Sequence, residues 1–338
     1  MPGSLVEFKT VDKSKVPVLG IDLGGTKIAA AIVQDNRIIG EPWKVPTPKG
    51  PDKIMETLIE LMDKFNQEQL VLGVGIATAG IVNPSTGEVV GSTGNLPGWE
   101  GTPIKKVIEA KTALRCHVEN DANAAAYGEV CAQPKLQDKT CVVTVTLGTG
   151  IGCGIVINGK IYRGGHFAGG EAGHIKVSME NRRRCTCDLW DCWEAYGSGR
   201  GLLATGWDML EGVSPEQSRL ALKRDHLTTQ DILDAAKDGE ILGQKALEKW
   251  HEHVACGLVS LCHTLDPDVF VLTGGMSKFV DYTMLREMVA DRTLPRVSEK
   301  LEIHPSLLGE AAGMIGAADL VLDQAYEAEQ TPQSMPSA

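Results

Sequence analysis

The chain has 338 residues, and at ~150 residues per domain this length predicts about two domains. Its 33 Lys and Arg against 44 Asp and Glu give a formal net charge of −11, which argues against a broad basic face for nucleic acid or an anionic membrane. Hydrophobic residues at 43% and charged residues at 23% exclude wholesale disorder and collagen-like or coiled-coil chains. Any phosphate that the protein binds must therefore be met by local geometry.

Nothing in the sequence indicates secretion or a membrane. Residues 1–15 contain no apolar signal-peptide core, no stretch approaches ~18 apolar residues, and the cysteine count of nine is odd. We therefore expect a cytoplasmic protein with reduced thiols and no membrane contact. The polar, patternless ends, 1–15 and 327–338, are expected to be flexible tails.

Short apolar runs with β-branched residues alternate with longer amphipathic segments, a pattern typical of an α/β protein. Strands are expected at 16–23, 28–34, 37–45, 71–77, 115–119, 141–146, 152–157 and 269–273. Helices are expected at 52–66, 103–112, 122–131, 193–205, 229–236, 240–265, 282–291 and 310–325.

One internal similarity links two of the predicted hairpins. The segment 19–33 can be laid on 143–157, and each is a strand, a Gly/Thr turn and a second strand that ends in another turn. Two Gly-containing hairpins can look alike by chance, and a chance likeness is one possible explanation. The alternative is a duplicated lobe, in which each half opens with a β-hairpin whose tip faces a shared cleft.

The hairpin tips are candidate phosphate-binding turns, because glycine lets backbone N–H groups approach an anion closely. Neither tip is a P-loop or a dinucleotide fingerprint, since both lead into a strand rather than a helix. They could also be nothing more than tight turns. Asp22 could hold Mg²⁺ through water, or could simply form the turn. A third turn after the strand at 269–273 suits a nucleoside or its α-phosphate. The candidate residues are Asp22, Gly24, Gly25, Thr26, Lys27, Gly148, Thr149, Gly150, Gly274 and Gly275.

A second set of polar residues suits a neutral polyol and a proton acceptor. Asp121 follows a strand and precedes an Ala-rich helix, so it could act only as the helix N-cap. A carboxylate in that place could also accept a proton from an attacking hydroxyl in phosphoryl transfer. Carboxylates and amides on Gly-rich loops can bind sugar hydroxyls, and the candidate segments are 77–80, which includes Ala79 and Gly80, 94–99 and 169–174, together with Glu194, although no spacing rule shows that they converge.

Four candidate zinc ligands fall within nineteen residues: His174, Cys185, Cys187 and Cys192. A Cys3His set is a recognised structural zinc site, although the spacing is not that of a common finger, and reduced thiols remain the alternative. The other six cysteines lie among apolar or small residues and are expected to be buried thiols.

Six motifs follow one another along the chain: Asp22-Leu-Gly-Gly-Thr-Lys27, Gly94-Asn-Leu-Pro-Gly-Trp99, Glu119-Asn-Asp-Ala-Asn-Ala124, Leu147-Gly-Thr-Gly-Ile-Gly152, Gly170-Glu-Ala-Gly-His174 and Cys185-x-Cys187-x4-Cys192-x-Glu194. In this order they resemble the ROK family of sugar kinases and sugar-responsive repressors, and within it the bacterial ATP-dependent glucokinases. The resemblance covers residues 18–322.

The resemblance implies an actin-like ATPase (ribonuclease H-like) fold, with two lobes, a duplicated β-sheet core and a central cleft. The small lobe would comprise 16–122 and 310–326, and the large lobe, with a zinc knuckle, 123–309. Asp121 would be the catalytic base, and Asn95, Asn120, Glu171, His174 and Glu194 would bind the sugar. ATP, Mg²⁺ and structural Zn²⁺ would be used. A homodimer or homotetramer is expected.

The implied activity is phosphorylation of the 6-hydroxyl of glucose by ATP. N-acetylmannosamine, N-acetylglucosamine, fructose or mannose remain possible substrates and polyphosphate a possible donor, and a non-catalytic sugar sensor is the alternative class. The family's repressors carry an N-terminal helix-turn-helix domain, whereas only about twenty residues precede Asp22 here, so no nucleic-acid binding is expected.

The knuckle departs from the family pattern Cys-x-Cys-Gly-x-x-Gly-Cys. Asp188 and Asp191 stand in place of the two glycines. Asp tolerates a left-handed backbone at more cost than Gly, which puts the retention of zinc in question.

Overall fold

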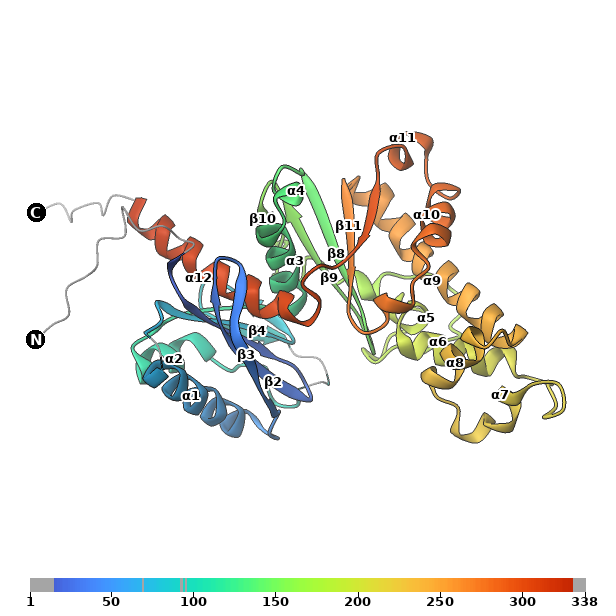
Figure 1. The fold of residues 1–338 in the computed structure, drawn as a ribbon, viewed down its shortest axis with the longest axis horizontal. Coiled ribbons are helices and arrows are strands. Elements are labelled where there is room, and N and C mark those ends of the chain that lie inside the picture. Colours follow the sequence, from blue (N-terminus) through green and yellow to red (C-terminus); the bar gives the residue numbers. More distant parts are fainter. Residues whose placement is uncertain (1–14, 69, 92–93, 95, 331–338) are drawn as a thin grey trace, which may run out of the picture. The chain divides into compact units, whose positions relative to one another are not determined.

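The computed structural model describes residues 15–68, 70–91, 94 and 96–330. The chain divides into two compact units: unit 1 is Met1–Pro134 with Ala311–Ala338, and unit 2 is Lys135–Glu310 (Figure 1). The first boundary expected from sequence, after residue 122, falls inside α3 (Asp121–Ala132), because α3 packs along α12 (Ala312–Gln330) within unit 1. In the described part of the chain, no helix has the length and apolar character needed to cross a membrane.

Unit 1 contains a five-stranded mixed sheet in the order β3-β2-β1-β4-β7. β1 pairs antiparallel with β2, and β2 with β3, whereas β1, β4 and β7 run parallel. The strands are β1 (Val18–Leu23), β2 (Lys27–Gln34), β3 (Arg37–Pro46), β4 (Gly73–Thr78) and β7 (Arg115–Asn120). A small hairpin, β5 (Ile81–Asn83) with β6 (Glu88–Gly91), follows β4 and was not predicted.

The two faces of this sheet differ in residue size. Leu19 and Ile76 belong to the apolar cluster under α1 (Pro51–Glu68) and α2 (Ile104–Thr112). On the opposite face, a Cβ added to Gly20 would lie 2.3 Å from the backbone oxygen of Met314, and one added to Gly75 would lie 2.0 Å from that of Ala317. Glycine is required at both positions because α12 lies directly against the strands.

Unit 2 repeats the same sheet. Its order is β10-β9-β8-β11-β12, with β8, β9 and β10 antiparallel and β8, β11 and β12 parallel. The strands are β8 (Cys141–Leu147), β9 (Ile151–Ile157), β10 (Lys160–Ile161), β11 (Val269–Thr273) and β12 (Glu302–Pro305). The two segments that the sequence aligned are β1–β2 and β8–β9, and they occupy equivalent places, which supports the duplication.

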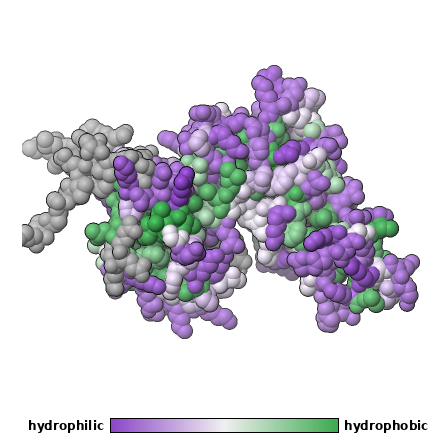
Figure 2. Space-filling view, viewed as in Figure 1, coloured by the Kyte–Doolittle hydropathy of each residue, from purple (hydrophilic) through white to green (hydrophobic). Residues whose placement is uncertain are grey.

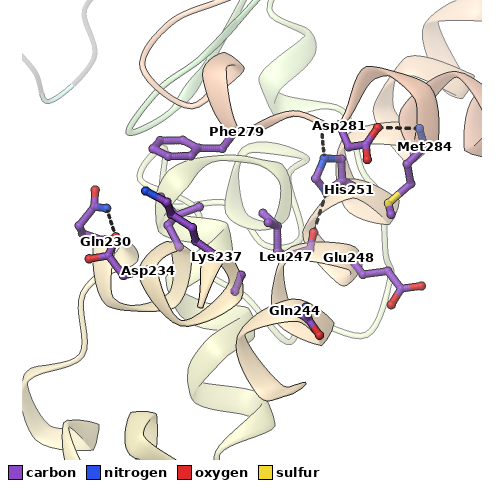
Figure 3. A pocket seen from close by; sticks show the side chains of 12 residues that line it. Gln230, Asp234, Lys237, Gln244, Leu247, Glu248, His251, Phe279, Asp281 and Met284 are labelled. Carbon is purple, nitrogen blue, oxygen red and sulfur yellow. Dashed lines mark hydrogen bonds between the residues drawn. The ribbon is translucent and has the colours of Figure 1, made fainter. Parts of the chain in front are cut away.

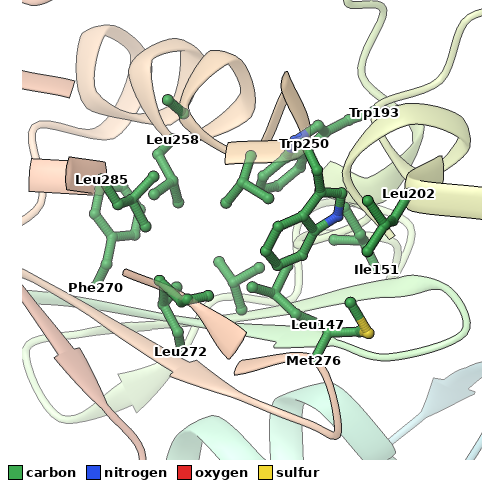
Figure 4. Packing of buried hydrophobic residues seen from close by; sticks show 14 of the residues in the cluster. Leu147, Ile151, Trp193, Leu202, Trp250, Leu258, Phe270, Leu272, Met276 and Leu285 are labelled. Atoms are coloured by element: carbon green, nitrogen blue, oxygen red, sulfur yellow. The ribbon is translucent and has the colours of Figure 1, made fainter. Parts of the chain in front are cut away.

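A large apolar core lies between the unit 2 sheet and its helices (Figure 4). Trp193 and Trp250 are both fully buried, and each indole N–H has a partner. The indole of Trp250 donates to the Gly197 oxygen at 2.9 Å, and that of Trp193 to the His253 oxygen at 2.8 Å. In the space-filling view, hydrophilic residues cover most of the visible surface of unit 2 (Figure 2).

Most predicted helices are present within a few residues of their expected bounds. The prediction of one helix over 193–205 was wrong: Ser198 is extended, with φ −83° and ψ 177°, and its side chain caps a new helix by accepting from the Gly201 N–H. α12 also runs beyond residue 327, where the tail was expected; residues 1–14 and 331–338 lie outside the described part.

The helical segments of unit 2 are α4 (Pro134–Gln137), η3 (Ala172–His174), α5 (Glu194–Gly197), α6 (Gly199–Met209), α7 (Arg219–Leu222), η4 (Arg224–His226), α8 (Thr229–Lys237), α9 (Ile241–Leu265), η5 (Ser277–Phe279), α10 (Tyr282–Ala290), α11 (Pro295–Ser298) and η6 (Gly309–Ala311).

Candidate functional site

In unit 1 the parallel strands bring their carboxyl ends to one edge. Asp22 of β1 lies beside Ala77 of β4, and Ala77 lies beside Glu119 of β7. The chain segments that leave this edge are the Gly24–Lys27 turn, the Ala79–Gly80 turn and α3. In open α/β sheets ligands bind at this edge, so the register assembles the predicted residues of unit 1 from three separate parts of the sequence.

Asn120 and Asp121 form a hydrogen-bonded pair at the start of α3. The Asn120 side chain is the N-cap, since its Oδ1 accepts from the Asn123 N–H at 3.1 Å, so the alternative in which Asp121 acts only as the cap does not hold. The Asn120 amide donates to the Gly80 oxygen at 3.0 Å and to Asp121 Oδ1 at 3.1 Å. Asp121 Oδ1 also accepts from the Ala122 N–H at 2.8 Å. The half-buried Asp121 carboxylate is thereby held in one orientation.

A buried tryptophan fixes the turn next to this pair. The indole N–H of Trp99 donates to Thr78 Oγ1 at 3.0 Å, and both side chains are fully buried. Ala79 and Gly80 follow Thr78 directly, and Gly80 has a positive φ of 107°. Asn95, predicted to bind sugar, lies outside the described residues.

The Gly24–Lys27 turn is tight and solvent-facing. The Gly24 N–H donates to the Lys27 oxygen at 3.0 Å, and Thr47 Oγ1 donates to the Gly24 oxygen at 2.7 Å. Gly25 and Thr26 at the tip are exposed. The tip of the turn is therefore accessible to a ligand, as the prediction required.

In unit 2 the structure brings the second and third Gly turns together. The Met276 N–H donates to the Leu147 oxygen at 2.9 Å, and Gly274, at φ +87°, lies so close to Leu147 that a Cβ would stand 2.5 Å from the same oxygen. The Gly199 N–H donates to the Gly148 oxygen at 2.8 Å. The Gly148–Gly150 turn, the Gly274–Gly275 turn and the start of α6 thus form one local assembly.

The predicted sugar-binding residues of unit 2 lie next to this assembly. Glu194 Oε2 accepts from the Ile151 N–H at 3.0 Å, and Oε1 accepts from Thr186 Oγ1 at 2.6 Å. His174 Nε2 lies 3.7 Å from Glu171 Oε2. Burial raises the pKa of the Glu171 carboxyl, His174 opposes this, and the Glu194 carboxylate adds to it. The side chains of Glu171, His174 and Glu194 therefore interact electrostatically as one polar cluster.

The four predicted zinc ligands converge. One ligand atom from each of His174, Cys185, Cys187 and Cys192 lies within 4.8 Å of all the others. Cys187 Sγ is 3.7 Å from Cys192 Sγ, and His174 Nδ1 is 3.7 Å from Cys185 Sγ. Tetrahedral zinc with Zn–S bonds of about 2.3 Å separates its ligand atoms by about 3.6–3.8 Å, so the residues present fit Zn²⁺.

The two aspartates that replace knuckle glycines do adopt the left-handed backbone, with φ +65° at Asp188 and +56° at Asp191. Asp191 has a further role that the sequence did not reveal. Its carboxylate accepts from three consecutive backbone N–H groups, at 2.6, 3.1 and 3.0 Å, and from the Tyr196 hydroxyl at 2.7 Å. Although burial opposes it, these hydrogen bonds lower the pKa of the Asp191 carboxyl. Asp191 therefore organises residues 181–183 before the first knuckle cysteine.

A cavity of about 560 Å³ lies between α8, α9 and the segment from η5 to α10 (Figure 3). Phe279 forms one wall, and η5, to which it belongs, begins two residues after Gly275. Burial lowers the pKa of His251, so its neutral ring can accept from the Asp281 N–H at 2.8 Å through Nε2 and donate to the Leu247 oxygen through Nδ1. The remaining lining residues are Gln230, Leu233, Asp234, Ala236, Lys237, Gln244, Glu248 and Met284.

Comparison with known proteins identifies the family. Residues 18–324 match the ROK family. The chain belongs to the ROK family. This confirms the predicted family and the actin-like ATPase fold, whose duplicated sheet is described above.

Several ROK relatives are sugar kinases. A glucokinase of Streptomyces coelicolor is 32% identical over 317 residues, covering 89% of this chain and 96% of the relative. An N-acetyl-D-glucosamine kinase of Vibrio parahaemolyticus is 30% identical and covers 89% and 98%. The crystal structure of a ROK family glucokinase from Streptomyces griseus, in complex with glucose and AMPPNP, superposes with a TM-score of 0.74 at 31% identity, covering 91% of this chain and 99% of that one.

Proposed function

We propose that this ROK protein is an ATP-dependent hexose kinase that phosphorylates the 6-hydroxyl of glucose. The observation that carries the proposal is the Asn120–Asp121 pair, a carboxylate held in place by two N–H donors beside the Gly80 turn. Because Asn120 caps α3, a capping role does not account for the orientation of Asp121. The similarity to glucokinases over nearly the whole chain supports the choice of glucose.

In the proposed reaction, Asp121 accepts the proton of the sugar hydroxyl as its oxygen attacks the γ-phosphorus in line. Such general-base catalysis contributes typically ~10²- to 10⁴-fold to the rate. In unit 1, Asn120 and the Gly80 turn offer amide and backbone groups for sugar hydroxyls. In unit 2, Glu171, His174 and Glu194 offer carboxylate and imidazole groups for sugar hydroxyls. Ala79 and Asn95 belong to the same proposal.

The Gly24–Lys27 turn of unit 1 and the Gly148–Gly150 turn of unit 2 each offer backbone N–H groups that can bind phosphate oxygens and stabilise developing negative charge. Magnesium, when bound, neutralises charge on the transferred phosphoryl group, and Asp22 is the residue proposed to hold it. We place the nucleoside in the cavity beside Phe279, because the Gly274–Gly275 turn leads directly into η5.

Structural Zn²⁺ is proposed for the four-residue cluster. Burial raises the pKa of the Cys185 thiol to about 12, so that this thiol is protonated at neutral pH when no metal is bound. A metal ion favours the thiolate and ties residues 185–192 to His174, which is also a proposed sugar ligand.

A coupled assay tests the function. Purified protein is given Mg²⁺, ATP or polyphosphate, and in turn glucose, mannose, fructose, N-acetylglucosamine or N-acetylmannosamine. We expect the highest kcat/KM with glucose and ATP. A higher value with an N-acetylated sugar would reassign the substrate. Sugar binding by calorimetry with no turnover for any pair would instead indicate a sugar sensor.

A further inference from the structure

We propose that Arg200 is a phosphate-binding residue of the nucleotide site. The inference rests on the proposed kinase function and deepens it, since it assigns a side-chain cation to a turn from which sequence reasoning predicted only backbone groups. No motif singled out Arg200, because it is an ordinary-looking residue in the first turn of α6.

Two consecutive residues anchor the start of α6 to the Gly148–Gly150 turn. The Gly199 N–H donates to the Gly148 oxygen at 2.8 Å, and Nε of Arg200 donates to the Thr149 oxygen at 3.1 Å. The guanidinium is therefore held against the exposed tip of the turn rather than pointing freely into solvent.

Most of the guanidinium remains available to a ligand. It has five N–H donors in a planar fork. Nε–H is used by Thr149, and Nη2 lies 3.5 Å from Glu194 Oε1, long for a hydrogen bond. Among the described residues, the Arg200 side chain makes no other hydrogen bond, and it is 49% exposed.

Arg200 is not needed to satisfy Glu194. The Glu194 carboxylate is 12% exposed and already accepts shorter hydrogen bonds from the Ile151 N–H and the Thr186 hydroxyl. The contact with Glu194 therefore does not account for the position of Arg200. The other feature that its side chain contacts is the proposed phosphate turn, Gly148–Gly150. Arginine forks bind phosphate oxygens bidentately, which a lysine ammonium cannot do.

This arrangement also fits the charge of the protein. With a net charge of −11, the chain as a whole repels a nucleotide polyphosphate. A cation fixed at the tip of the turn offsets that repulsion where the phosphates bind. The contribution should therefore grow with the number of phosphates on the ligand.

The test compares Arg200→Ala and Arg200→Lys with Arg182→Ala as control, since the Arg182 side chain is 73% exposed and pairs with the exposed Glu180. Binding of AMP, ADP and AMPPNP is measured by calorimetry with Mg²⁺ held constant, and glucose binding is measured separately. For Arg200→Ala we expect AMPPNP to bind about 10- to 100-fold more weakly, ADP less affected, and AMP and glucose unchanged. Arg200→Lys should be intermediate, and millimolar guanidinium should restore part of the loss in Arg200→Ala.

Three results would overturn the proposal. Wild-type affinity for AMPPNP in Arg200→Ala would remove Arg200 from the phosphate site while leaving the kinase function intact. Equal weakening of AMP and AMPPNP would show that Arg200 only shapes the pocket. Wild-type protein that binds no nucleotide would overturn both this inference and the proposed function. If Arg200→Ala does not fold, as judged by circular dichroism, Arg200→Lys decides by the same comparison.

Discussion

The side-chain amide of Asn120 donates a hydrogen bond to the backbone oxygen of Gly80 at 3.0 Å, which ties the end of β7 to the turn after β4. The same amide donates to Asp121 Oδ1, and the Asn120 oxygen caps α3. One side chain thus fixes the turn, the helix and the carboxylate together. The orientation of Asp121 is a property of the sheet edge rather than of Asp121 alone.

Replacement of Asp121 by Asn separates binding from chemistry. An amide keeps the size of the side chain and an acceptor oxygen for the Ala122 N–H, but it cannot take up the hydroxyl proton. We expect glucose affinity within a few-fold of wild type and kcat reduced by ~10²- to 10⁴-fold. Steady-state kinetics and glucose calorimetry measure the two quantities.

The control for that variant is Asp138→Asn, which changes an exposed carboxyl after α4. It should leave kcat and glucose affinity unchanged. Near-normal turnover in Asp121→Asn would exclude Asp121 as the base.

The sequence predicted the sheet and the Gly turns well because these depend on local signals. The alternation of β-branched runs and the repeat of 19–33 in 143–157 identified β1–β2 and β8–β9 to within a residue or two. The helix break at Ser198 was missed, because it depends on the nonlocal hydrogen bonds of the Trp250 indole to the oxygens of Gly197 and Ser198.

The cap of α3 could not be assigned from the sequence for a related reason. Asn120 and Asp121 are both good N-cap residues, so composition could not choose between them. The choice is made by the turn after β4, where the Gly80 oxygen accepts a hydrogen bond from the Asn120 amide. The position of Arg200 at the Gly148–Gly150 turn likewise depends on contacts between segments about fifty residues apart, which no local pattern contains.

Zinc binding can be tested on a single cysteine. Cys187→Ser removes one of four converging ligands, so we expect metal analysis to fall from about one zinc per wild-type chain to well below that, with a lower thermal midpoint. Cys256→Ser is the matched control, since Cys256 is also half-buried in unit 2 but lies outside the cluster. Wild-type protein purified without zinc, and unaffected by a chelator, would contradict the assignment.

The two knuckle aspartates should respond in opposite directions to glycine. Asp188 has a positive φ, and its 83% exposed side chain pairs with the exposed Arg184. Asp188→Gly therefore relieves strain at little loss and should stabilise the protein by about 0.5–1 kcal/mol. Asp191→Gly relieves similar strain but removes an acceptor of four hydrogen bonds, and should destabilise by about 3 kcal/mol. Urea unfolding followed by tryptophan fluorescence measures both. Equal effects would show that the Asp191 carboxylate is dispensable.

Phe279→Ala tests where the nucleoside binds. Phe279 is half-buried and forms a wall of the 560 Å³ cavity that begins just after the Gly274–Gly275 turn, so its loss removes apolar contact area from a bound base but leaves the phosphate turns unchanged. We expect KM for ATP to rise about tenfold, corresponding to about 1.4 kcal/mol, with KM for glucose unchanged. Tyr162→Ala, which truncates a 47% exposed aromatic side chain outside the cavity, should change neither constant. An unchanged KM for ATP in Phe279→Ala would place the nucleoside elsewhere, because a wall that contacts the base cannot be removed without weakening its binding.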